Sequence, residues 1–458
     1  MRCREREPGA VAAWAMALVA LSSLGAPGPA FAQAAATTLV YPPWSHCYGM
    51  HRVNQTHLTL RAGFKYKFDD PEGVAAVKMA CEDDPNTPRD DDELTVIGVN
   101  SGQNLLIYNT SITAIAFYGR EGNGPGEFRH PHGVAADRDG NVVVADTGND
   151  RLHVLKYDHD ALHHVRFIQG IFNGRPLRGP LGVALEKGEI YVCDPDQDRL
   201  LVFGTDGEFR RELRPERDGQ PLLQEPFAVA VIRSDAEMNF FGEDFIAVSD
   251  SSSSRLWKLD PRGQPFAVRR VRDLAPGGGE FYYLAIDYHA SVYASDRAGK
   301  IHKFDRELRF LCDIGRPGRD DYQFDEPRGL GLYRRFGQLF VAEREGAQYL
   351  WMGTDVFTPS LSDVRPDGPG RYQGVVRYFL TEYANVRLEL VDGENRSRAV
   401  LQPAVWTPPG AIEKAVQFEA DRSPAGWRLR VEAVPTYSAR KMLRVEKLSQ
   451  PVRVAGAP

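Results

Sequence analysis

The sequence contains 458 residues, and its 56 Lys and Arg against 62 Asp and Glu give a formal net charge of −6. A mildly acidic chain without a basic cluster argues against a nucleic-acid partner and against a basic membrane-docking surface. A hydrophobic content of 42% with 26% charged residues is ordinary for globular proteins and excludes a wholly disordered chain.

The first 32 residues have the pattern of a secretory signal. Three arginines give a basic start, an apolar stretch runs over 11–21, and Ala30-Phe31-Ala32 has the small-x-small pattern of a cleavage site. The apolar stretch is too short to cross a bilayer comfortably, and no later segment comes close. We therefore expect cleavage after Ala32 and a secreted or periplasmic product without a membrane span.

After an N-terminal segment at 33–56, one short motif occurs six times. In most copies a Pro, a variable residue and a Gly lead into an apolar strand, and neighbouring copies start 46 to 60 residues apart. The copies are PEGVAAV (71–77), PHGVAAD (131–137), PLGVALE (180–186), PFAVAVI (226–232), FYYLAID (281–287) and PRGLGLY (327–333). That spacing is what one four-stranded blade of a β-propeller occupies.

Two further strand-like runs follow each copy of the motif. In the second repeat they are 141–146 and 151–157, separated by the turn 147–150. Alternating apolar and β-branched residues between Asp, Gly and Ser turns are typical of strands. The six repeats therefore predict an all-β fold with a six-bladed propeller over 57–356.

The repeats resemble NHL repeats, most clearly over residues 119–158. Three repeats carry an Asp five residues before an Arg, as Asp146–Arg151, Asp194–Arg199 and Asp250–Arg255. The resemblance implies a closed ring in which each blade buries its faces against its neighbours. The sixth repeat has only three clear strands, so we expect residues 57–63 to supply its outermost strand and close the ring.

The C-terminal part of the chain lacks the motif. Residues 357–371 are rich in Pro, Gly and Asp and are predicted to form a linker. The runs 375–393, 415–421 and 426–434 alternate like strands of a small antiparallel sandwich. The layout over roughly 370–448, including Ala425-Gly426-Trp427 at the start of the penultimate strand, resembles the Ig-like domains of the flagellar hook-capping type, and we expect such a domain at 372–458.

Four cysteines follow the signal, and the alternation of strand direction suggests one pairing. The connection between blades and the turn between the second and third strands share one face of the ring, which we call the top. Cys81 follows the innermost strand of blade one, and Cys47 precedes the predicted closing strand, so both are expected at the bottom. We predict a Cys47–Cys81 disulfide, with Cys193 and Cys312 buried and free; the alternative is that all four are reduced.

The variable residue of each motif is expected to line the top mouth of the central channel. These residues are Glu72, His132, Leu181, Phe227, Tyr282 and Arg328. Acidic, basic and aromatic groups around a channel predict a small-molecule pocket, although any propeller shows some mixture of residues there. The six-bladed peptidyl-amidoglycolate lyases hold zinc with several histidines, and a zinc site needs three protein ligands. Only His132 is available here, so we assign no catalytic residue and no metal ligand.

The turns between the second and third strands carry acidic residues at the top. They are Asp146, Asp150, Asp194, Asp196, Asp198 and Asp250. Their oxygens could hold calcium, but the first Asp of each turn is favoured as a partner of the following Arg. We therefore predict no cofactor, with calcium as the alternative.

Two insertions, 81–93 and 233–244, join first and second strands and should lie on the bottom face. The first is acidic and is expected to be a solvated loop. The second contains Phe240 and Phe241, which are the predicted partner-binding residues because exposed aromatic side chains often mark contact sites.

These observations favour a secreted NHL-repeat propeller that is a binding or scaffold module for an extracellular or envelope protein or glycan. The alternative is a lyase or hydrolase with its site at the top mouth. A third interpretation is a purely structural envelope component. The sequence shows no paired nucleophile and base and no trio of metal ligands, which favours binding over catalysis. The fold alone does not distinguish the two, because propellers host both binding and catalysis.

Overall fold

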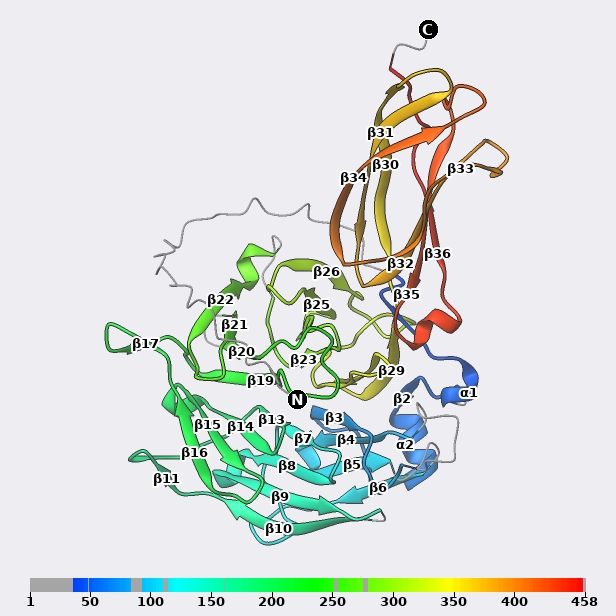
Figure 1. Ribbon diagram of the computed structural model, residues 1–458. Helices are drawn as coiled ribbons and strands as arrows, with labels where there is room; N and C mark the ends of the chain where they lie inside the picture. The colour runs from blue at the N-terminus through cyan, green and yellow to red at the C-terminus, as the bar shows by residue number, and fades with distance from the viewer. Residues whose placement is uncertain are drawn as a thin grey trace, which may run out of the picture.

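The computed structural model describes residues 36–455 except 48, 84–92, 110–113, 160, 251–253 and 275–278. The predicted signal at 1–32 and most of the acidic insertion at 81–93 lie outside the described residues. Within them the chain is all-β, with a propeller followed by two further sheets (Figure 1). Among the helices that the structure describes, none has the length and apolarity that a membrane crossing needs.

Six antiparallel sheets form the propeller within the described residues. Blade one consists of β3 (Pro71–Val77), β4 (Thr95–Asn100), β5 (Leu105–Asn109) and β6 (Ile115–Tyr118). Blade two consists of β7 (Val134–Ala136), β8 (Asn141–Asp146), β9 (Arg151–Tyr157) and β10 (Leu162–Ile168). Blade three consists of β13 (Val183–Glu186), β14 (Glu189–Asp194), β15 (Arg199–Gly204) and β16 (Phe209–Leu213). Blade four consists of β19 (Pro226–Ile232), β20 (Phe245–Asp250), β21 (Arg255–Leu259) and β22 (Pro265–Arg270). Blade five consists of β23 (Leu284–Ile286), β24 (Val292–Asp296), β25 (Lys300–Phe304) and β26 (Phe310–Ile314). Blade six contains β27 (Leu330–Tyr333), β28 (Gln338–Glu343) and β29 (Gly346–Met352). Short hairpins follow blades two and three, as β11 (Ile171–Phe172) with β12 (Arg175–Pro176) and β17 (Glu216–Arg217) with β18 (Gln220–Pro221).

The innermost strands make the ring. Each of β3, β7, β13, β19 and β23 contacts the innermost strand of the next blade, and β27 contacts β3. The apolar clusters of the propeller lie between adjacent blades, as expected when each blade buries both faces. The fold class predicted from the repeated motif is therefore confirmed.

The outermost part of blade six comes from the N-terminal segment, but not from residues 57–63. β1 (Leu39–Val40) and β2 (Arg52–Asn54) both pair with β29, on either side of helix α1 (Trp44–Cys47). Residues 57–62 instead belong to helix α2 (Gln55–Ala62), so that part of the prediction is wrong.

The physical reason is a helix cap that the alternation of 57–63 concealed. The Asn54 side chain accepts hydrogen bonds from the backbone N–H groups of Thr56, at 3.0 Å, and His57, at 3.3 Å. Leu58 is buried in the helix whereas Leu60 is 80% exposed, so the apparent strand pattern does not correspond to a buried face.

The C-terminal region consists of two antiparallel sheets around a shared apolar core. The first contains β30 (Val356–Pro366), β31 (Arg371–Leu380) and β34 (Gly410–Glu419), and the second contains β33 (Ser397–Thr407), β32 (Ala384–Val391), β35 (Arg428–Pro435) and β36 (Val445–Leu448). The predicted linker 357–371 is thus mostly strand. Pro359 is tolerated because β30 is an edge strand and its register shifts between Phe357 and Ser360.

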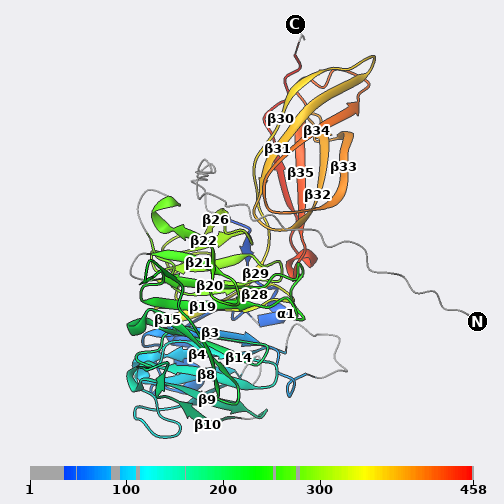
Figure 2. The ribbon, with the colours of Figure 1, turned by 60° about the vertical axis from the view of Figure 1, so that its left-hand side comes forward.

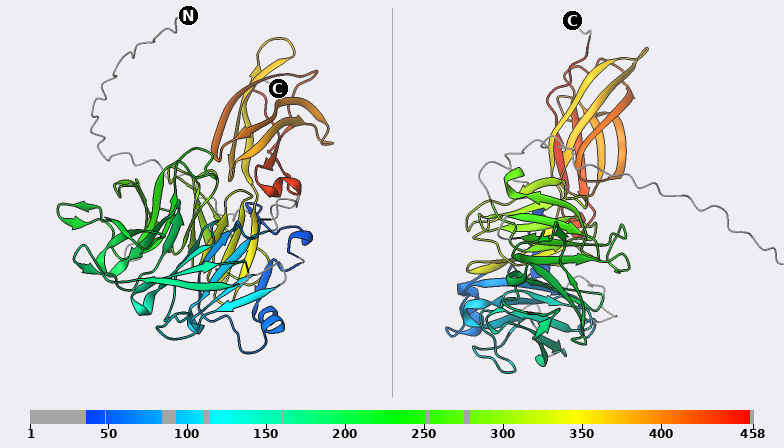
Figure 3. Two further views of the ribbon diagram at one scale, coloured as in Figure 1. Left: turned by 60° about the horizontal axis from the view of Figure 1, so that its bottom comes forward. Right: turned by 90° about the vertical axis from the view of Figure 1, so that its left-hand side faces the viewer.

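The two-sheet region stands at the rim of the propeller beside blades five and six, as Figure 2 shows. The two views of Figure 3 show the same placement from other directions. Thr38 ties the parts together, because its Oγ1 donates to Thr381 Oγ1 at 2.7 Å while its carbonyl accepts from the N–H of Gly353 at 2.9 Å. The N-terminal segment therefore contacts both blade six and the C-terminal sheets.

The motif glycines allow adjacent blades to approach one another through their backbones. The N–H of Gly73 donates to His132 O at 3.0 Å, Gly133 to Leu181 O at 3.1 Å, and Gly182 to Phe227 O at 2.8 Å. We call this set of contacts the inter-blade ring. A Cβ on Gly133 would lie only 2.4 Å from Leu181 O, so side chains are excluded there.

Blades four and five replace the motif glycine, by Ala228 and Tyr283, and each has a serine on its second strand instead. Ser249 Oγ accepts from the N–H of Ala228 at 3.0 Å and donates to Tyr282 O of the next blade at 3.1 Å. Ser295 Oγ accepts from the N–H of Tyr283 at 2.9 Å. The Ser249 hydroxyl thus bridges blades four and five where the glycine is missing, whereas the contacts of Ser295 Oγ with Tyr283 lie within blade five.

We expect Gly133→Ala to lower the free energy of unfolding by about 1–3 kcal/mol, because the new methyl group overlaps the carbonyl of the next blade. Gly98→Ala is the matched control, since its Cβ would meet Ile107 O at an ordinary 3.8 Å. Thermal unfolding of both variants checks this, and equal melting temperatures would contradict the importance of the inter-blade ring.

Candidate functional site

The six variable residues of the motifs form a group at the top mouth, which we call the top ring: Glu72, His132, Leu181, Phe227, Tyr282 and Arg328. The Glu72 side chain is buried, and its Oε1 accepts from Arg328 Nη1 at 2.9 Å and from the Tyr282 hydroxyl at 3.3 Å. Phe227 stacks on Tyr282 with ring centroids 4.3 Å apart. These side chains fill the mouth by contacting one another, and ligand binding by the top ring stays a prediction.

Glu72 and His132 form an unusual pair within the top ring. Glu72 Oε2 lies 3.7 Å from His132 Nδ1, and neither atom has a hydrogen-bond partner among the described residues. Burial raises the pKa of Glu72 to about 7 despite the opposing effect of Arg328, and burial lowers the pKa of His132 to about 4. The pair therefore combines a neutral imidazole with a carboxyl group that titrates near neutral pH, which is a pattern found at functional sites.

A cavity of about 720 Å³ lies below the top ring and opens on the bottom face. Residues of all six innermost strands line it, and the side chains on these strands are mainly Val, Ala, Leu and Ile. Charged residues surround its opening, including Arg138, Lys187 and Arg334. A second cavity of about 430 Å³ lies beside it and is lined by residues of the propeller, such as His289, and of the segment after β35, such as Tyr437.

The aromatic residues of the blade-four insertion contact the C-terminal sheets. The Phe240 and Trp406 rings have centroids 5.8 Å apart, and the Phe241 and Tyr383 rings 5.7 Å. Tyr383 in turn stacks on Trp406. Phe240 and Trp406 remain 49% and 40% exposed, so part of the predicted contact surface is used within the chain and part faces solvent.

A buried polar cluster beneath these aromatic residues joins the two parts of the chain. Lys303 and Glu382 form an ion pair with both side chains fully buried, and Tyr293 OH donates to Glu382 Oε2 at 3.1 Å. His289 Nδ1 lies 3.0 Å from the Tyr437 hydroxyl. Burial and the nearby Glu382 raise the pKa of Asp287 to about 7. No pattern in the sequence indicates this cluster, because its members come from separate repeats and from beyond them.

The aspartates of the top turns are used in blade caps. Asp146 and Asp194 each pair with the expected arginine at 2.7 Å, and Asp250 pairs with Arg255. Asp146 Oδ1 also accepts from the N–H of Arg129 at 2.7 Å, which fixes the preceding loop. These contacts support the interpretation that the first Asp of each turn pairs with the following Arg and caps the blade. In 36–455, apart from the gaps, no group of three or more His, Cys, Asp and Glu side chains is placed to hold a metal ion.

The predicted Cys47–Cys81 disulfide is not formed, and the cysteines of the described part, including Cys193 and Cys312, are free. Cys47 is buried in α1 at the outer edge of blade six, whereas the exposed Cys81 follows the innermost strand of blade one. Neighbouring strands are about 4.8 Å apart, so the three strands β27–β29 keep these positions beyond the reach of a disulfide.

Comparisons with known proteins find one repeat family and several solved structures of low sequence identity. A family model described as NHL repeat matches residues 128–155, which include β8 and most of β9. No match is found among curated protein sequences. A solved structure of a provisional gluconolactonase is 15% identical over 69% of this chain and 97% of its own, with a TM-score of 0.44.

Two further solved structures are similar at the same level. Regucalcin from Agrobacterium tumefaciens, described as a calcium-binding protein, is 11% identical over 63% of this chain and 91% of its own, with a TM-score of 0.40. PorZ of the type-IX secretion system of Porphyromonas gingivalis is 13% identical over 88% of this chain and 54% of its own, with a TM-score of 0.45. At such identities function does not transfer, and the fold class rests on the sheets described above.

The raised pKa of Glu72 makes stability depend on pH. The folded protein holds this proton up to about pH 7, whereas the unfolded chain releases it near pH 4.3, so the free energy of unfolding falls as pH rises through this window. Relative to Glu72→Gln, the wild type should lose roughly 3 kcal/mol between pH 4 and pH 8. Thermal unfolding across this range measures the difference.

Glu208→Gln is the control for that comparison, because Glu208 is exposed in the turn between β15 and β16, at the outer edge of blade three. It should show the same pH dependence as the wild type. A constant difference between wild type and Glu72→Gln at every pH would contradict the assignment.

Proposed function

We propose that this chain is a secreted, six-bladed NHL-type propeller that acts as a binding or scaffold module for an extracellular or envelope protein or glycan. The observation that carries the proposal is an aromatic surface made jointly by the blade-four insertion and strand β33, with Phe240 and Trp406 at its exposed edge. We call it the aromatic face. Exposed aromatic side chains grouped in this way supply contact area at little conformational cost.

The arrangement beneath the aromatic face supports a preformed binding surface. The buried Lys303–Glu382 pair and the contact of His289 with Tyr437 fix the C-terminal sheets against blade five. A surface held in its binding geometry loses less entropy when a partner docks. The signal pattern at 1–32 supports export, which places such a surface where envelope or extracellular partners occur.

We expect Phe240→Ala and Trp406→Ala each to weaken partner binding at least about tenfold, because buried aromatic anchors often contribute more than 1.4 kcal/mol at interfaces. The measurement is binding of the mature protein to a panel of envelope proteins and glycans by biolayer interferometry. Phe266→Ala is the matched control, because Phe266 is 64% exposed on β22, away from this surface. Equal loss in all three variants, or loss in none, would contradict the proposal.

The Glu72–His132 pair supports a second candidate function, a lyase or hydrolase at the top mouth. A carboxyl group with a pKa of about 7 beside a neutral imidazole can accept and return a proton at neutral pH. On this hypothesis the purified chain turns over a peptidyl-amidoglycolate, and Glu72→Gln lowers turnover about 100-fold or more. Turnover that survives the substitution, or no turnover by the wild type, counts against it.

A further inference from the structure

The contact between the propeller and the C-terminal sheets contains a lysine and a glutamate without access to solvent. Lys303 lies on β25 and Glu382 between β31 and β32; both side chains are fully buried, and Lys303 Nζ contacts Glu382 Oε2. An ammonium group has three N–H donors, yet the part of the chain that the structure describes offers Lys303 Nζ no second acceptor. Taking two charges out of water costs more free energy than their attraction returns unless further hydrogen bonds compensate. As an ion pair, this contact is therefore unfavourable.

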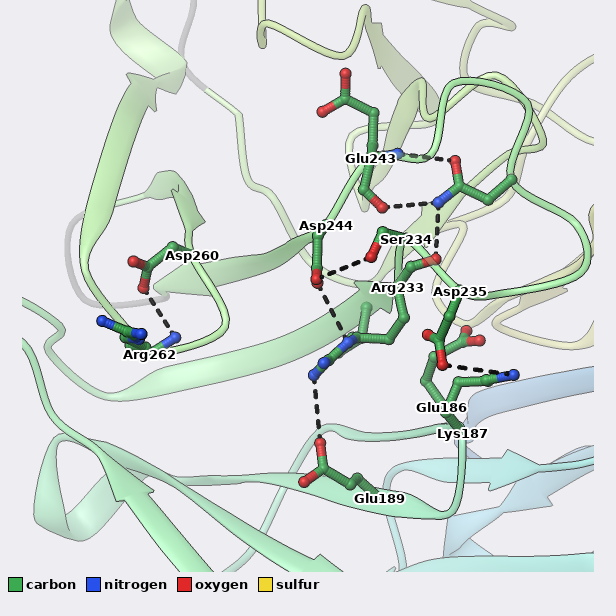
Figure 4. Close-up of polar contacts among 12 residues, drawn as sticks. Glu186, Lys187, Glu189, Arg233, Ser234, Asp235, Glu243, Asp244, Asp260 and Arg262 are labelled. Carbon is green, nitrogen blue, oxygen red and sulfur yellow. Dashed lines mark hydrogen bonds and ion pairs between the residues drawn. The ribbon is translucent and has the colours of Figure 1, made fainter. Parts of the chain in front are cut away.

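Lysine–carboxylate pairs at the surface are in a different situation. Lys187 and Asp235 lie 3.7 Å apart with 46% and 69% of their side chains exposed (Figure 4). Water stabilises both charges there, and an ammonium group has no lone pair with which to attack a carbon atom. Burial removes this stabilisation from Lys303 and Glu382, so transfer of a proton away from the ammonium group costs less in the interior than at the surface.

The Tyr293 hydroxyl connects Glu382 to another buried carboxyl group. It lies 3.1 Å from Glu382 Oε2 and 3.2 Å from Asp287 Oδ2. A hydroxyl has one hydrogen, so both contacts are hydrogen bonds only when one of the two carboxyl groups carries a proton. Burial and the nearby Glu382 raise the pKa of the fully buried Asp287 to about 7. Asp287 can therefore hold a proton that Lys303 releases through Tyr293.

The two oxygens of Glu382 have different surroundings. The backbone N–H of Tyr383 donates to Oε1 at 2.7 Å. A fixed N–H at this position stabilises the negative charge that develops on Oε1 when a nucleophile adds to the carboxyl carbon. Oε2 instead contacts Lys303 and Tyr293, through which it can receive the protons that it needs in order to leave as water.

We propose that Lys303 and Glu382 react to form an amide, which cross-links blade five covalently to the C-terminal sheets. A bond forms between Lys303 Nζ and Glu382 Cδ, the bond between Cδ and Oε2 breaks, and one water molecule leaves. A first proton passes from the ammonium group through Tyr293 to Asp287, which frees the lone pair of Nζ. The departing Oε2 receives this proton back along the same route and a second proton from Nζ, so no other reactant is consumed.

Two properties of the interior favour this reaction. Holding the two groups in contact replaces a bimolecular encounter, an effect equivalent to concentrations of up to about 10⁵–10⁸ M. The amide is uncharged, so its formation removes the buried ion pair together with the cost of desolvating it. The bond joins residues 79 positions apart in the chain. It lies in the interior of the contact, so the proposal does not depend on what the aromatic face binds.

The test is the intact mass of the purified full-length mature chain, measured after denaturation by mass spectrometry, with the N-terminus established by sequencing. We expect the wild type to be lighter than its sequence by the mass of one water molecule. Lys303→Met and Glu382→Leu should each have the full mass of their sequence. Lys187→Met is the matched control, because it removes the exposed lysine of Figure 4 and should keep the deficit.

Tryptic digestion locates the bond. The wild type should release residues 301–306 joined to residues 378–387, because trypsin does not cleave after an acylated Lys303. A wild-type chain of full mass, a deficit that persists in Lys303→Met, or a deficit without the joined peptides would each overturn the inference.

The role of Asp287 is tested by the rate of linking. Asp287→Asn has nearly the same size but cannot take up the proton, so the linked fraction at equal times after synthesis should fall at least about tenfold. Near-ultraviolet circular dichroism shows whether this variant is folded, and if it is not, Tyr293→Phe is measured in its place. A folded variant that links as fast as the wild type would overturn the proposed proton transfer.

Discussion

The close approach of neighbouring blades at the top of the channel determines which end of the channel is filled and which end is open. At the inter-blade ring, backbone N–H groups donate to carbonyl groups of the next blade at N–O distances of 2.8 to 3.1 Å, as in the hydrogen bonds of a sheet. Such an approach is possible only where a side chain is absent, or where a serine hydroxyl takes part in the contact, as at Ser249. The top mouth is consequently narrow and filled, and the open volume lies at the other end of the channel.

This asymmetry separates the chemistry of the two faces. At the top, burial of Glu72 and His132 shifts their pKa values in opposite directions, because both groups lose water without gaining a hydrogen bond to each other. At the bottom, basic and acidic side chains surround the opening of the cavity. The aromatic face adds a third region, where the propeller and the C-terminal sheets meet.

The fold was predictable from the sequence because its signal is repeated. Each Pro-x-Gly motif predicts one innermost strand, and the pairs such as Asp146–Arg151 predict one cap per blade, so errors in one repeat are corrected by the others. Features that occur only once in the chain had no such support from repetition. The capping of α2 by Asn54 and the edge strand that contains Pro359 each occur once, and the local patterns there favoured a strand and a linker instead.

The candidate sites were predictable only in part. Position in the motif was sufficient to group Glu72 with Arg328, because equivalent residues of a ring must meet at its axis. Nothing in the motif indicates that Lys303 faces Glu382, since that contact depends on how a non-repeating region docks on the ring. Phe240 and Phe241 were identified by their exposure in an insertion, but their neighbours Tyr383 and Trp406 come from that same region.

The pairing of β1 with β29 also has a consequence for folding during synthesis of the chain. Leu39 lies opposite Met352, so the first strand that the structure describes has its partner among the last strands of the propeller. Joining segments so distant in the chain is entropically unfavourable and slow. The N-terminal segment therefore lacks its strand partner until β29 has been synthesised, so the outer edge of blade six is among the last parts of the propeller to be completed.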